Sequence, residues 1–344
     1  MPQMRPRLIL TLGDCAGVGP ELALRMMGDP AVAAVCRLSV YGNLRLIERV
    51  ASAARIPFPP TVALLPCPDG VAPPPQSERH IFFDFPFAEA DGIAAGRVQA
   101  ACGRQAHGWI CAAVRDVRRG CADGIVTGPV NKEAFHAAGV AFPGHTELLA
   151  HLTGGAAPCM SFYSDRLFLS LATIHEAVGR VPGLLSVSAL LRTIRLTHDA
   201  CDVPRPRIGV LALNPHAGEN GLFGTEERDI IAPAIEAARA DGLSVHGPLV
   251  PDTAFTWLMS GKPSPYDGYV AMYHDQGLIP FKMAAFDTGV NVTLGLPVIR
   301  TSPDHGTAFD LAWKGEASPA SMAHAVHLAA RLAAKKRDAE HRRP

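Results

Sequence analysis

The sequence predicts an α/β protein with two domains, built around largely parallel sheets that are flanked by helices. Three observations support this prediction. The chain has 344 residues, which is too long for one simple core. Short apolar runs alternate along it with segments of helical periodicity. Several of these runs end abruptly in polar side chains, as buried parallel strands do where they present groups at their carboxyl ends.

The composition excludes several classes of protein. Hydrophobic residues make up 48% of the chain and charged residues 19%, so a large interior can be buried. The counts of Lys+Arg and of Asp+Glu are both 32, so no overall charge favours nucleic acid or an anionic membrane as a partner. No apolar run approaches the roughly 18 residues that cross a bilayer, and Met1–Arg7 lacks the apolar region of a signal peptide. We therefore expect a cytoplasmic protein whose eight cysteines are small buried thiols.

The first predicted elements are a strand at Leu8–Leu12, a glycine-rich loop and a helix with Pro20 in its first turn. Glycines in such a loop allow a ligand close to the backbone, and the N–H groups of the helix start favour an anion. The glycine spacing is not that of a Rossmann dinucleotide site, so the loop is either a tight turn or a ligand-facing one. The proline-rich segment Ile56–Pro86 predicts an irregular surface connection.

A candidate anion site follows in the middle of the chain. Apolar residues at helical spacing predict a helix within Gly96–Arg119, and a strand at Gly124–Thr127 runs into polar residues. Gly144 then precedes His145 and Thr146 at the predicted start of another helix. Two interpretations are open. Either the hydroxyl, the imidazole N–H and the backbone donors converge on an anion, or Thr146 is an N-cap beside a surface histidine.

Three histidines each follow a predicted strand: His175 after Leu167–Ile174, His216 after Ile208–Leu213, and His274 after the apolar run that begins at Tyr269. Their shared position at strand ends suits a divalent metal ion. A single histidine after a strand is more often a satisfied structural residue, so the metal interpretation depends on all three together.

The remaining predicted elements complete the alternating pattern. Amphipathic helices are expected at Leu184–Leu196 and Thr225–Ala240, the second of which Asp241 and Gly242 close. The charged end of the chain, Lys335–Pro344, is expected to fray as a solvated tail.

Six motifs occur in order over nearly the whole chain: Gly13-Asp14 with Gly17-Val18-Gly19-Pro20-Glu21, Thr127-Gly128-Pro129-Val130-Asn131-Lys132, Gly144-His145-Thr146-Glu147, Leu213-Asn214-Pro215-His216-Ala217-Gly218-Glu219, Tyr273-His274-Asp275-Gln276-Gly277, and Gly289-Val290-Asn291-Val292-Thr293-Leu294-Gly295-Leu296-Pro297. Together they resemble the 4-hydroxythreonine-4-phosphate dehydrogenase family of vitamin B6 biosynthesis. The resemblance implies a homodimer with a fold like that of isocitrate and isopropylmalate dehydrogenases, and an active site in the interdomain cleft that is completed across the dimer. It further implies a cofactor-side domain of residues 1–130 and 290–344, and a metal, substrate and dimerisation domain of residues 131–289.

The same resemblance implies roles for individual residues. His175, His216 and His274 would bind one divalent ion, which could be zinc, magnesium or cobalt. His274 and Lys282 would be catalytic. Contacts to a small phosphorylated hydroxy amino acid would come from His145, Thr146, Lys282, Asn291 and Arg300. Contacts to NAD or NADP would come from Asp304, His305, Gly306 and Thr307.

The reaction expected from this resemblance is oxidation of 4-phosphooxy-L-threonine, followed by decarboxylation to 3-amino-2-oxopropyl phosphate. Related members oxidise threonate or erythronate 4-phosphate, or aromatic cis-dihydrodiols, and these remain alternatives. Two further alternatives are a metal-dependent hydrolase and a non-catalytic binding protein, neither of which would need a nucleotide-binding segment. The chain departs from the family pattern at Cys15, where Pro is usual, at Glu176 and at Trp313, where a small residue is usual. Cys15 and Trp313 could change how the cofactor fits.

Overall fold

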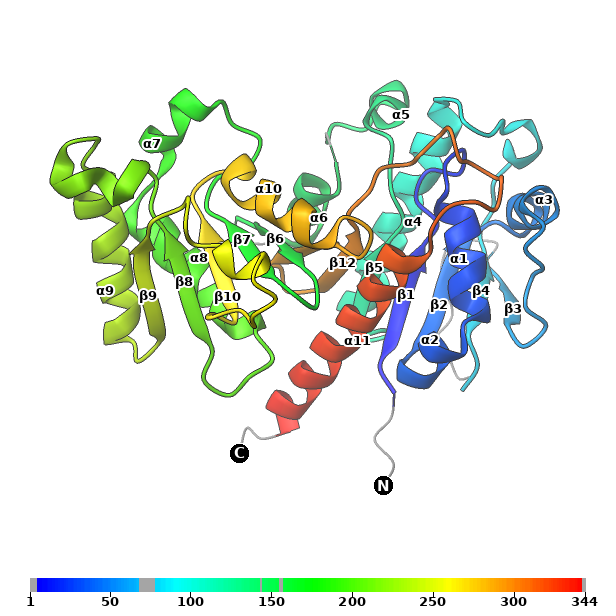
Figure 1. The fold of residues 1–344 in the computed structure, drawn as a ribbon. Coiled ribbons are helices and arrows are strands. Elements are labelled where there is room, and N and C mark those ends of the chain that lie inside the picture. Colours follow the sequence, from blue (N-terminus) through cyan, green and yellow to red (C-terminus); the bar gives the residue numbers. More distant parts are fainter. Residues whose placement is uncertain (1–4, 68–77, 143, 155–156, 342–344) are drawn as a thin grey trace. The chain divides into compact units, whose positions relative to one another are not determined.

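The chain forms two compact units, unit 1 with residues Met1–Ala157 and Leu296–Pro344, and unit 2 with Pro158–Gly295. The computed structural model describes residues 5–67, 78–142, 144–154 and 157–341. Each unit has a mostly parallel sheet flanked by helices, which confirms the predicted α/β class (Figure 1). Within the described ranges, no helix is long and apolar enough to cross a membrane.

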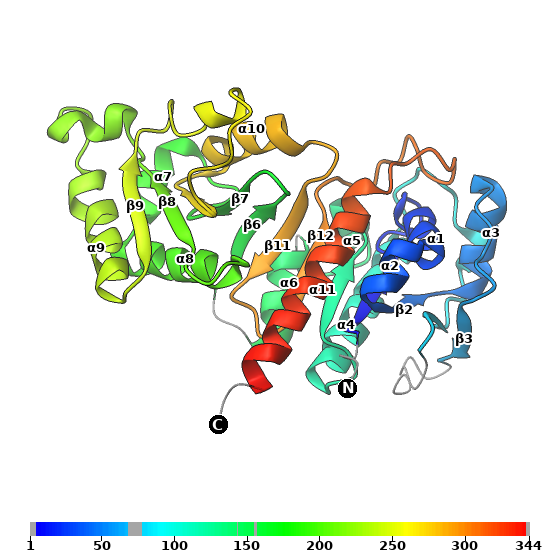
Figure 2. The same cartoon turned by 60° about the horizontal axis from the view of Figure 1, so that its bottom comes forward.

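Unit 1 contains a sheet in which every strand pair is parallel. Its strand order is β3 (Ala63–Pro66), β4 (Ile81–Asp84), β2 (Arg37–Gly42), β1 (Arg7–Thr11), β5 (Gly124–Thr127) and β12 (Ile299–Pro303). The helices of this unit are α1 (Gly19–Gly28), α2 (Pro30–Val35), α3 (Leu44–Ala54), α4 (Ala100–Arg118), α5 (Lys132–Ala137), α6 (His145–Thr153) and α11 (Ala320–His341). Helix α11 crosses one face of the sheet over β12, β5 and β1, and α4 covers the other face (Figures 1 and 2).

Unit 2 contains a mixed sheet, because β6 runs antiparallel to both of its neighbours. Its strand order is β11 (Val290–Leu294), β6 (Cys159–Tyr163), β7 (Phe168–Leu171), β10 (Gly268–Ala271), β8 (Arg207–Leu211) and β9 (Ser244–Leu249). The pairs β7–β10, β10–β8 and β8–β9 are parallel. Its helices are α7 (Val181–Leu184), α8 (Val187–Ala200), α9 (Ala232–Ala240) and α10 (His274–Ala285).

The central strand β10 shows why its sequence is a continuous apolar run. Tyr269 and Ala271 belong to the hydrophobic cluster that includes Phe281 of α10. Val270 and Met272 belong to the cluster formed with α8 and α9. Successive side chains of a strand point to opposite faces of the sheet. Both faces of β10 are therefore covered, and no position in it can be polar without losing apolar contact.

Two predictions about secondary structure are wrong. The segment Ile56–Pro86 contains two strands, β3 and β4, and Phe82 and Phe83 of β4 are fully buried. The prolines of this segment had indicated an irregular connection. Pro66, however, is the last residue of β3, which lies at the edge of the sheet, where a missing N–H is tolerated. Residues 68–77 lie outside the described ranges. The other error concerns Lys335–Pro344, which was expected to fray. Helix α11 continues to His341, and residues 342–344 lie outside the described ranges.

A tertiary ion pair explains the extra turns of α11. Nε and Nη2 of Arg337 donate to the two carboxylate oxygens of Asp123 at 2.8 and 2.6 Å. Asp123 also accepts the backbone N–H of Arg7 at 2.7 Å, so it joins the last helix to the first strand.

The prediction of small buried thiols fits most cysteines, since six of the eight are buried and Cys111 and Cys121 are partly exposed.

The boundaries of the units differ from the predicted domain division. Residues 131–157 were assigned to the metal-bearing domain, but α5 and α6 pack against α4 and belong to unit 1. Strand β11 was assigned to the cofactor-side domain, but it pairs with β6 and belongs to unit 2. The chain changes unit at Ala157/Pro158 and again at Gly295/Leu296, in short segments that contain glycine and proline and that were not recognised as boundaries in the sequence.

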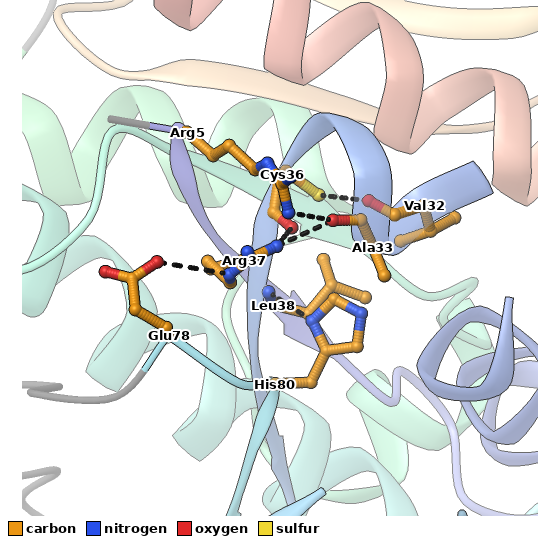
Figure 3. Close-up of polar contacts among 8 residues, drawn as sticks. All are labelled: Arg5, Val32, Ala33, Cys36, Arg37, Leu38, Glu78 and His80. Carbon is orange, nitrogen blue, oxygen red and sulfur yellow. Dashed lines mark hydrogen bonds and ion pairs between the residues drawn. The ribbon is translucent and has the colours of Figure 1, made fainter. Parts of the chain in front are cut away.

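A buried histidine lies at the amino ends of β2 and β4 (Figure 3). Nδ1 of His80 accepts the backbone N–H of Leu38 at 3.0 Å, and its Nε2 is buried with no hydrogen-bond partner among the described residues. Burial, and after it the charge of Arg37, lower the pKa of His80 to about 4. Arg37 donates to the carbonyl of Ala33 at 2.6 Å and lies 3.6 Å from the carboxylate of Glu78.

This histidine predicts a loss of stability in mild acid. Its folded pKa is lower than its unfolded pKa of about 6.5, so the stabilising effect of the neutral ring is complete above pH 6.5 and is lost as pH falls towards 4. We expect the free energy of unfolding to fall by about 2 kcal/mol. This is less than the full pKa shift would give, because the ring is partly screened by solvent. Urea unfolding of His80→Gln between pH 7 and 4.5 should show a shallower pH dependence than the wild type. If His80→Gln and the wild type lost stability equally with falling pH, His80 would not be the cause. His136 is exposed, so His136→Gln is the control and should show the pH dependence of the wild type.

Candidate active site

The three histidines proposed as metal ligands follow three neighbouring strands of unit 2. His175 comes after β7, His274 after β10 and His216 after β8, and these strands are adjacent in the order β7-β10-β8. Because the three strands are parallel, their carboxyl ends lie at one edge of the sheet. The rings of His175 and His274 have centroids 5.8 Å apart.

Carboxylates orient two of these imidazoles. His274 is the first residue of α10, and its Nδ1 lies 2.7 Å from Oδ1 of Asp275. Nδ1 of His216 lies 2.9 Å from Oε2 of Glu219. An N–H donated from Nδ1 to a carboxylate leaves Nε2 as the lone-pair nitrogen, which is the tautomer that binds a metal ion.

The turn that carries His216 has an unusual backbone. His216, Ala217, Glu219 and Asn220 all have positive φ values, between 43° and 57°. Each non-glycine residue in this region costs roughly 1–2 kcal/mol. The base of the turn is held by Glu227, whose Oε1 accepts the backbone N–H groups of Leu213 and Asn214 at 2.8 Å each. Strain of this kind persists only where the surroundings impose it, and it is concentrated at functional sites.

The structure brings together two of the three proposed ligands. Among the residues that the structure describes, no group of three His, Cys, Asp or Glu side chains is placed to hold a metal ion. His175 and His274 are adjacent, but His216 does not join them in a three-ligand group. Neutral imidazoles suit zinc or cobalt, so the donor type fits a divalent ion.

Two polar side chains that the sequence gave no role tie these strand ends together. Oε1 of Gln276 accepts the N–H of Met272, and its Nε2 donates to the carbonyl of Ala212, both at 2.7 Å. Thr173 donates its hydroxyl to the carbonyl of Met272, also at 2.7 Å. The ends of β7, β10 and β8 are thus joined by side chains as well as by the sheet.

Unit 1 contains a buried cation at the predicted substrate-binding position Arg300. This residue is 3% exposed, and its Nε and Nη2 donate to Oγ1 of Thr127 at 3.2 and 2.9 Å. Burial lowers the pKa of Arg300 to about 9, so it is still a cation at neutral pH. Strands β12 and β5 are adjacent, which brings Arg300 next to a threonine far away in the sequence.

The predicted helix start at His145 is confirmed, and its surroundings favour the anion interpretation. Gly144 is the N-cap of α6 and no side chain caps the helix, so Thr146 is not an N-cap. Burial, followed by the charge of Arg300, holds the pKa of His145 well below its ordinary value. Nε2 of this neutral ring is buried and has no hydrogen-bond partner among the described residues. A cation, an unpaired imidazole nitrogen and the start of a helix are therefore close to one another in unit 1.

The other two predicted substrate contacts lie in unit 2. Lys282 is on α10, with Nζ 5.6 Å from the centroid of the Phe286 ring. Asn291 is on β11, opposite Phe162 of β6, and is partly buried. The structure therefore groups Lys282 and Asn291 with the histidines, and groups Arg300 with His145 and Thr146.

The predicted cofactor segment Asp304–Thr307 follows β12 and packs on the glycine loop of unit 1. The N–H of Val18 donates to the carbonyl of Thr307 at 3.0 Å. A Cβ at Gly17 would lie 2.7 Å from that carbonyl oxygen, so only glycine allows this approach. A Cβ at Gly306 would meet no atom within 4 Å, which leaves open space for a ligand beside the segment. The glycine loop therefore supports this segment, and the segment borders open space at Gly306.

Comparison with known proteins identifies the family. The model for the family described as pyridoxal phosphate biosynthetic protein PdxA matches residues 34–329. The chain belongs to the PdxA family. It is 46% identical to 4-hydroxythreonine-4-phosphate dehydrogenase of Geobacter metallireducens, over 97% of each chain. It is 42% identical to D-threonate 4-phosphate dehydrogenase of Salmonella typhimurium, over 94% of this chain and 98% of the relative.

A solved structure of the PdxA family supports the fold. The crystal structure of 4-hydroxythreonine-4-phosphate dehydrogenase from Klebsiella pneumoniae has a TM-score of 0.81 and 40% identity, and the match covers 97% of this chain and 99% of that one. The family resemblance found in the sequence is therefore confirmed. The chain is a PdxA-family dehydrogenase, so the hydrolase and the non-catalytic binding protein are no longer alternatives.

Proposed function

We propose that this dehydrogenase oxidises 4-phosphooxy-L-threonine with NAD or NADP and a divalent metal ion, and that decarboxylation then gives 3-amino-2-oxopropyl phosphate for pyridoxal 5'-phosphate synthesis. The observation that supports this most is the cluster of Arg300, His145 and the start of α6 in unit 1. A phosphate dianion offers enough acceptor oxygens for all of these donors, and arginine with helix-start N–H groups recognises it well.

In this proposal the side chains of unit 1 bind the phosphate. The hydroxyl of Thr127 accepts two N–H groups of Arg300 and so fixes the plane of the guanidinium, which would bind the phosphate as a cation in this proposal. His145 is neutral, so it can donate one N–H to a phosphate oxygen without adding a second buried charge.

The side chains of unit 2 act on the alcohol. A divalent ion held by His175, His216 and His274 would make the substrate hydroxyl more acidic and polarise the ketone that forms from it. Lys282 would exchange protons with the reacting carbons, because an ammonium group on a flexible stem can reach them, donate a proton and, once neutral, accept one. Asp304, His305, Gly306 and Thr307 would help to bind the nicotinamide cofactor, which would supply the hydride acceptor.

An assay with several substrates tests this proposal against its alternatives. D-Threonate 4-phosphate has the same phosphate, so the anion cluster does not separate it from 4-phosphooxy-L-threonine, and one relative has that name. We expect NADH or NADPH to form with 4-phosphooxy-L-threonine at a higher kcat/KM than with D-threonate 4-phosphate, 4-hydroxythreonine or an aromatic cis-dihydrodiol. A preference for the threonate ester would replace the vitamin B6 assignment with the sugar-acid one. A preference for the dihydrodiol would exclude both phosphate esters.

We also propose that the active species is a homodimer, as the family resemblance implies. Three large apolar side chains are exposed in and just after α10, namely Ile279 (61%), Met283 (74%) and Phe286 (74%). Their spacing of four and three residues puts them on one helix face, and an exposed apolar patch of this kind is typical of a protein interface. Lys282 borders this face, and one chain assembles only two of the three ligands. A second copy that covers α10 could complete the site.

This interface predicts the effect of one charge. Met283→Glu should shift the protein from dimer to monomer in analytical ultracentrifugation and reduce turnover, because a carboxylate would be buried against apolar side chains. Leu222→Glu is the control, since Leu222 is equally exposed (73%) but lies outside α10. A wild-type monomer, or a Met283→Glu variant that remains a dimer, would rule out this interface.

A further inference from the structure

The loop that continues from the cofactor segment, residues 304–317, is fastened to the glycine loop and α1 at several points in unit 1. Nε1 of Trp313 donates to the carbonyl of Cys15 at 3.0 Å. The two carboxylate oxygens of Glu21 accept the backbone N–H groups of Gly315 and Ala317, both at 3.2 Å. Together with the bond from Val18 to Thr307, these contacts join both halves of the loop to the same support.

Trp313 is held in a strained conformation. It is 9% exposed and has a φ of 62°, which bulky side chains rarely adopt. Its ring packs against the guanidinium of Arg49, whose Cζ is 5.2 Å from the ring centroid. Arg49 is itself fixed by hydrogen bonds to the carbonyls of Ala90 and Ile93. Two of the three departures from the family pattern, Cys15 and Trp313, thus form a direct contact.

Neither Glu21 nor Trp313 is placed to touch a ligand. Glu21 is fully buried, and the indole N–H of Trp313 is used by Cys15. Both halves of the loop have exposed positions, and those of the cofactor segment are His305 and Gly306. A buried residue that binds only the backbone of a loop affects the ligand through the shape of that loop.

We propose that Trp313 and Glu21 are positioning residues for the nicotinamide cofactor, which hold loop 304–317 in its binding conformation before the cofactor arrives. This inference rests on the proposed function, because it takes Asp304–Thr307 as the cofactor segment. A loop that is ordered in advance does not lose conformational entropy when the ligand binds, so its affinity is higher. If one of these hydrogen bonds is removed, the free loop becomes less ordered. Cofactor binding must then order it, and the entropy lost in doing so lowers the affinity.

The test is cofactor affinity, measured by NADH and NADPH fluorescence on the full-length protein with divalent metal present. Trp313→Phe keeps a ring beside Arg49 but removes the N–H donor, and Glu21→Gln keeps the size of the side chain but replaces one acceptor by an NH2 group. We expect each variant to bind the reduced cofactor about tenfold more weakly. KM for the phosphorylated substrate and the amount of bound metal per chain should be unchanged. General damage to the fold would alter both.

The chain supplies a matched control in Trp257→Phe. Trp257 is also 9% exposed, lies in unit 2, and its Nε1 has no hydrogen-bond partner among the described residues. This variant should bind the cofactor as the wild type does. Equal affinity of Trp313→Phe and the wild type would overturn the inference and leave the proposed function intact. A wild-type protein that binds neither NADH nor NADPH would instead overturn the proposed function.

Hydrogen–deuterium exchange on the wild type gives a second measurement that needs no variant. We expect the amides of residues 308–317 to be protected without cofactor and to change little when NADH binds, while residues 304–307 gain protection. Fast exchange over 308–317 that slows only with NADH would mean that the cofactor orders the loop, and the inference would then be wrong. This result is decisive even if a substitution at Trp313 or Glu21 unfolds the protein.

Discussion

Arg300→Ala should reduce kcat/KM for the phosphorylated substrate by about a thousandfold. Hydrogen bonds to charged groups contribute roughly 1.5–3 kcal/mol each, and loss of two of them gives about 4 kcal/mol. The variant should turn over unphosphorylated 4-hydroxythreonine as slowly as the wild type does, so the preference for phosphate should almost disappear. Steady-state kinetics with the two substrates measures this preference directly.

The controls for Arg300 separate the geometry of the guanidinium from its charge. Arg300→Lys keeps the cation but cannot form the two bonds to Thr127, so it should recover only part of the loss. Metal content should be normal in both variants, because Arg300 belongs to unit 1 and the histidines to unit 2. The assignment fails if the wild type uses the unphosphorylated compound as well as the ester.

His274→Ala should abolish metal binding and lower turnover by more than about a hundredfold. Loss of a group that only orients a metal-binding side chain already lowers the affinity for the metal ion by roughly 10–100-fold. Loss of the metal-binding side chain itself should lower it further. Metal per chain can be measured by mass spectrometry after gel filtration, and chelated wild-type protein should regain activity when zinc, cobalt or magnesium is added. Asp275→Asn should have a smaller effect, because it changes only the partner of Nδ1.

A surface histidine provides the control for this experiment. His136 is exposed on α5, so His136→Ala should retain both metal and activity. Full turnover by a thoroughly chelated wild type that contains no metal would refute the metal assignment at all three histidines.

The sequence predicted the elements whose pattern is local. Strand β5 was predicted with its observed bounds, Gly124–Thr127, and the start of α6 at His145 was also correct. Strand β4 was missed because the prolines before and after its short apolar run, which contains Phe82 and Phe83, indicated an irregular connection. The last turns of α11 were missed because the pairing of Arg337 with Asp123 is a tertiary contact.

The same distinction applies to the site. The family resemblance implied roles for His145 and Arg300, and the structure places both in unit 1. No pattern could indicate that Thr127 accepts bonds from Arg300, since 173 residues separate them. Gln276 was part of a recognised motif, but its bond to the carbonyl of Ala212 spans 64 residues and depends on the strand order. The sequence also gave no sign that only two of the three histidines would be adjacent.

The discontinuous make-up of unit 1 has a consequence during translation. Its sheet is completed only when the last segment, Leu296–Pro344, supplies β12 and α11. Until that segment leaves the ribosome, β5 has an unpaired edge, which is a site for aggregation, while all the strands of unit 2 have already been synthesised. A nascent chain that stops after Gly295 would carry His175, His216 and His274 but would lack Arg300, the proposed phosphate ligand.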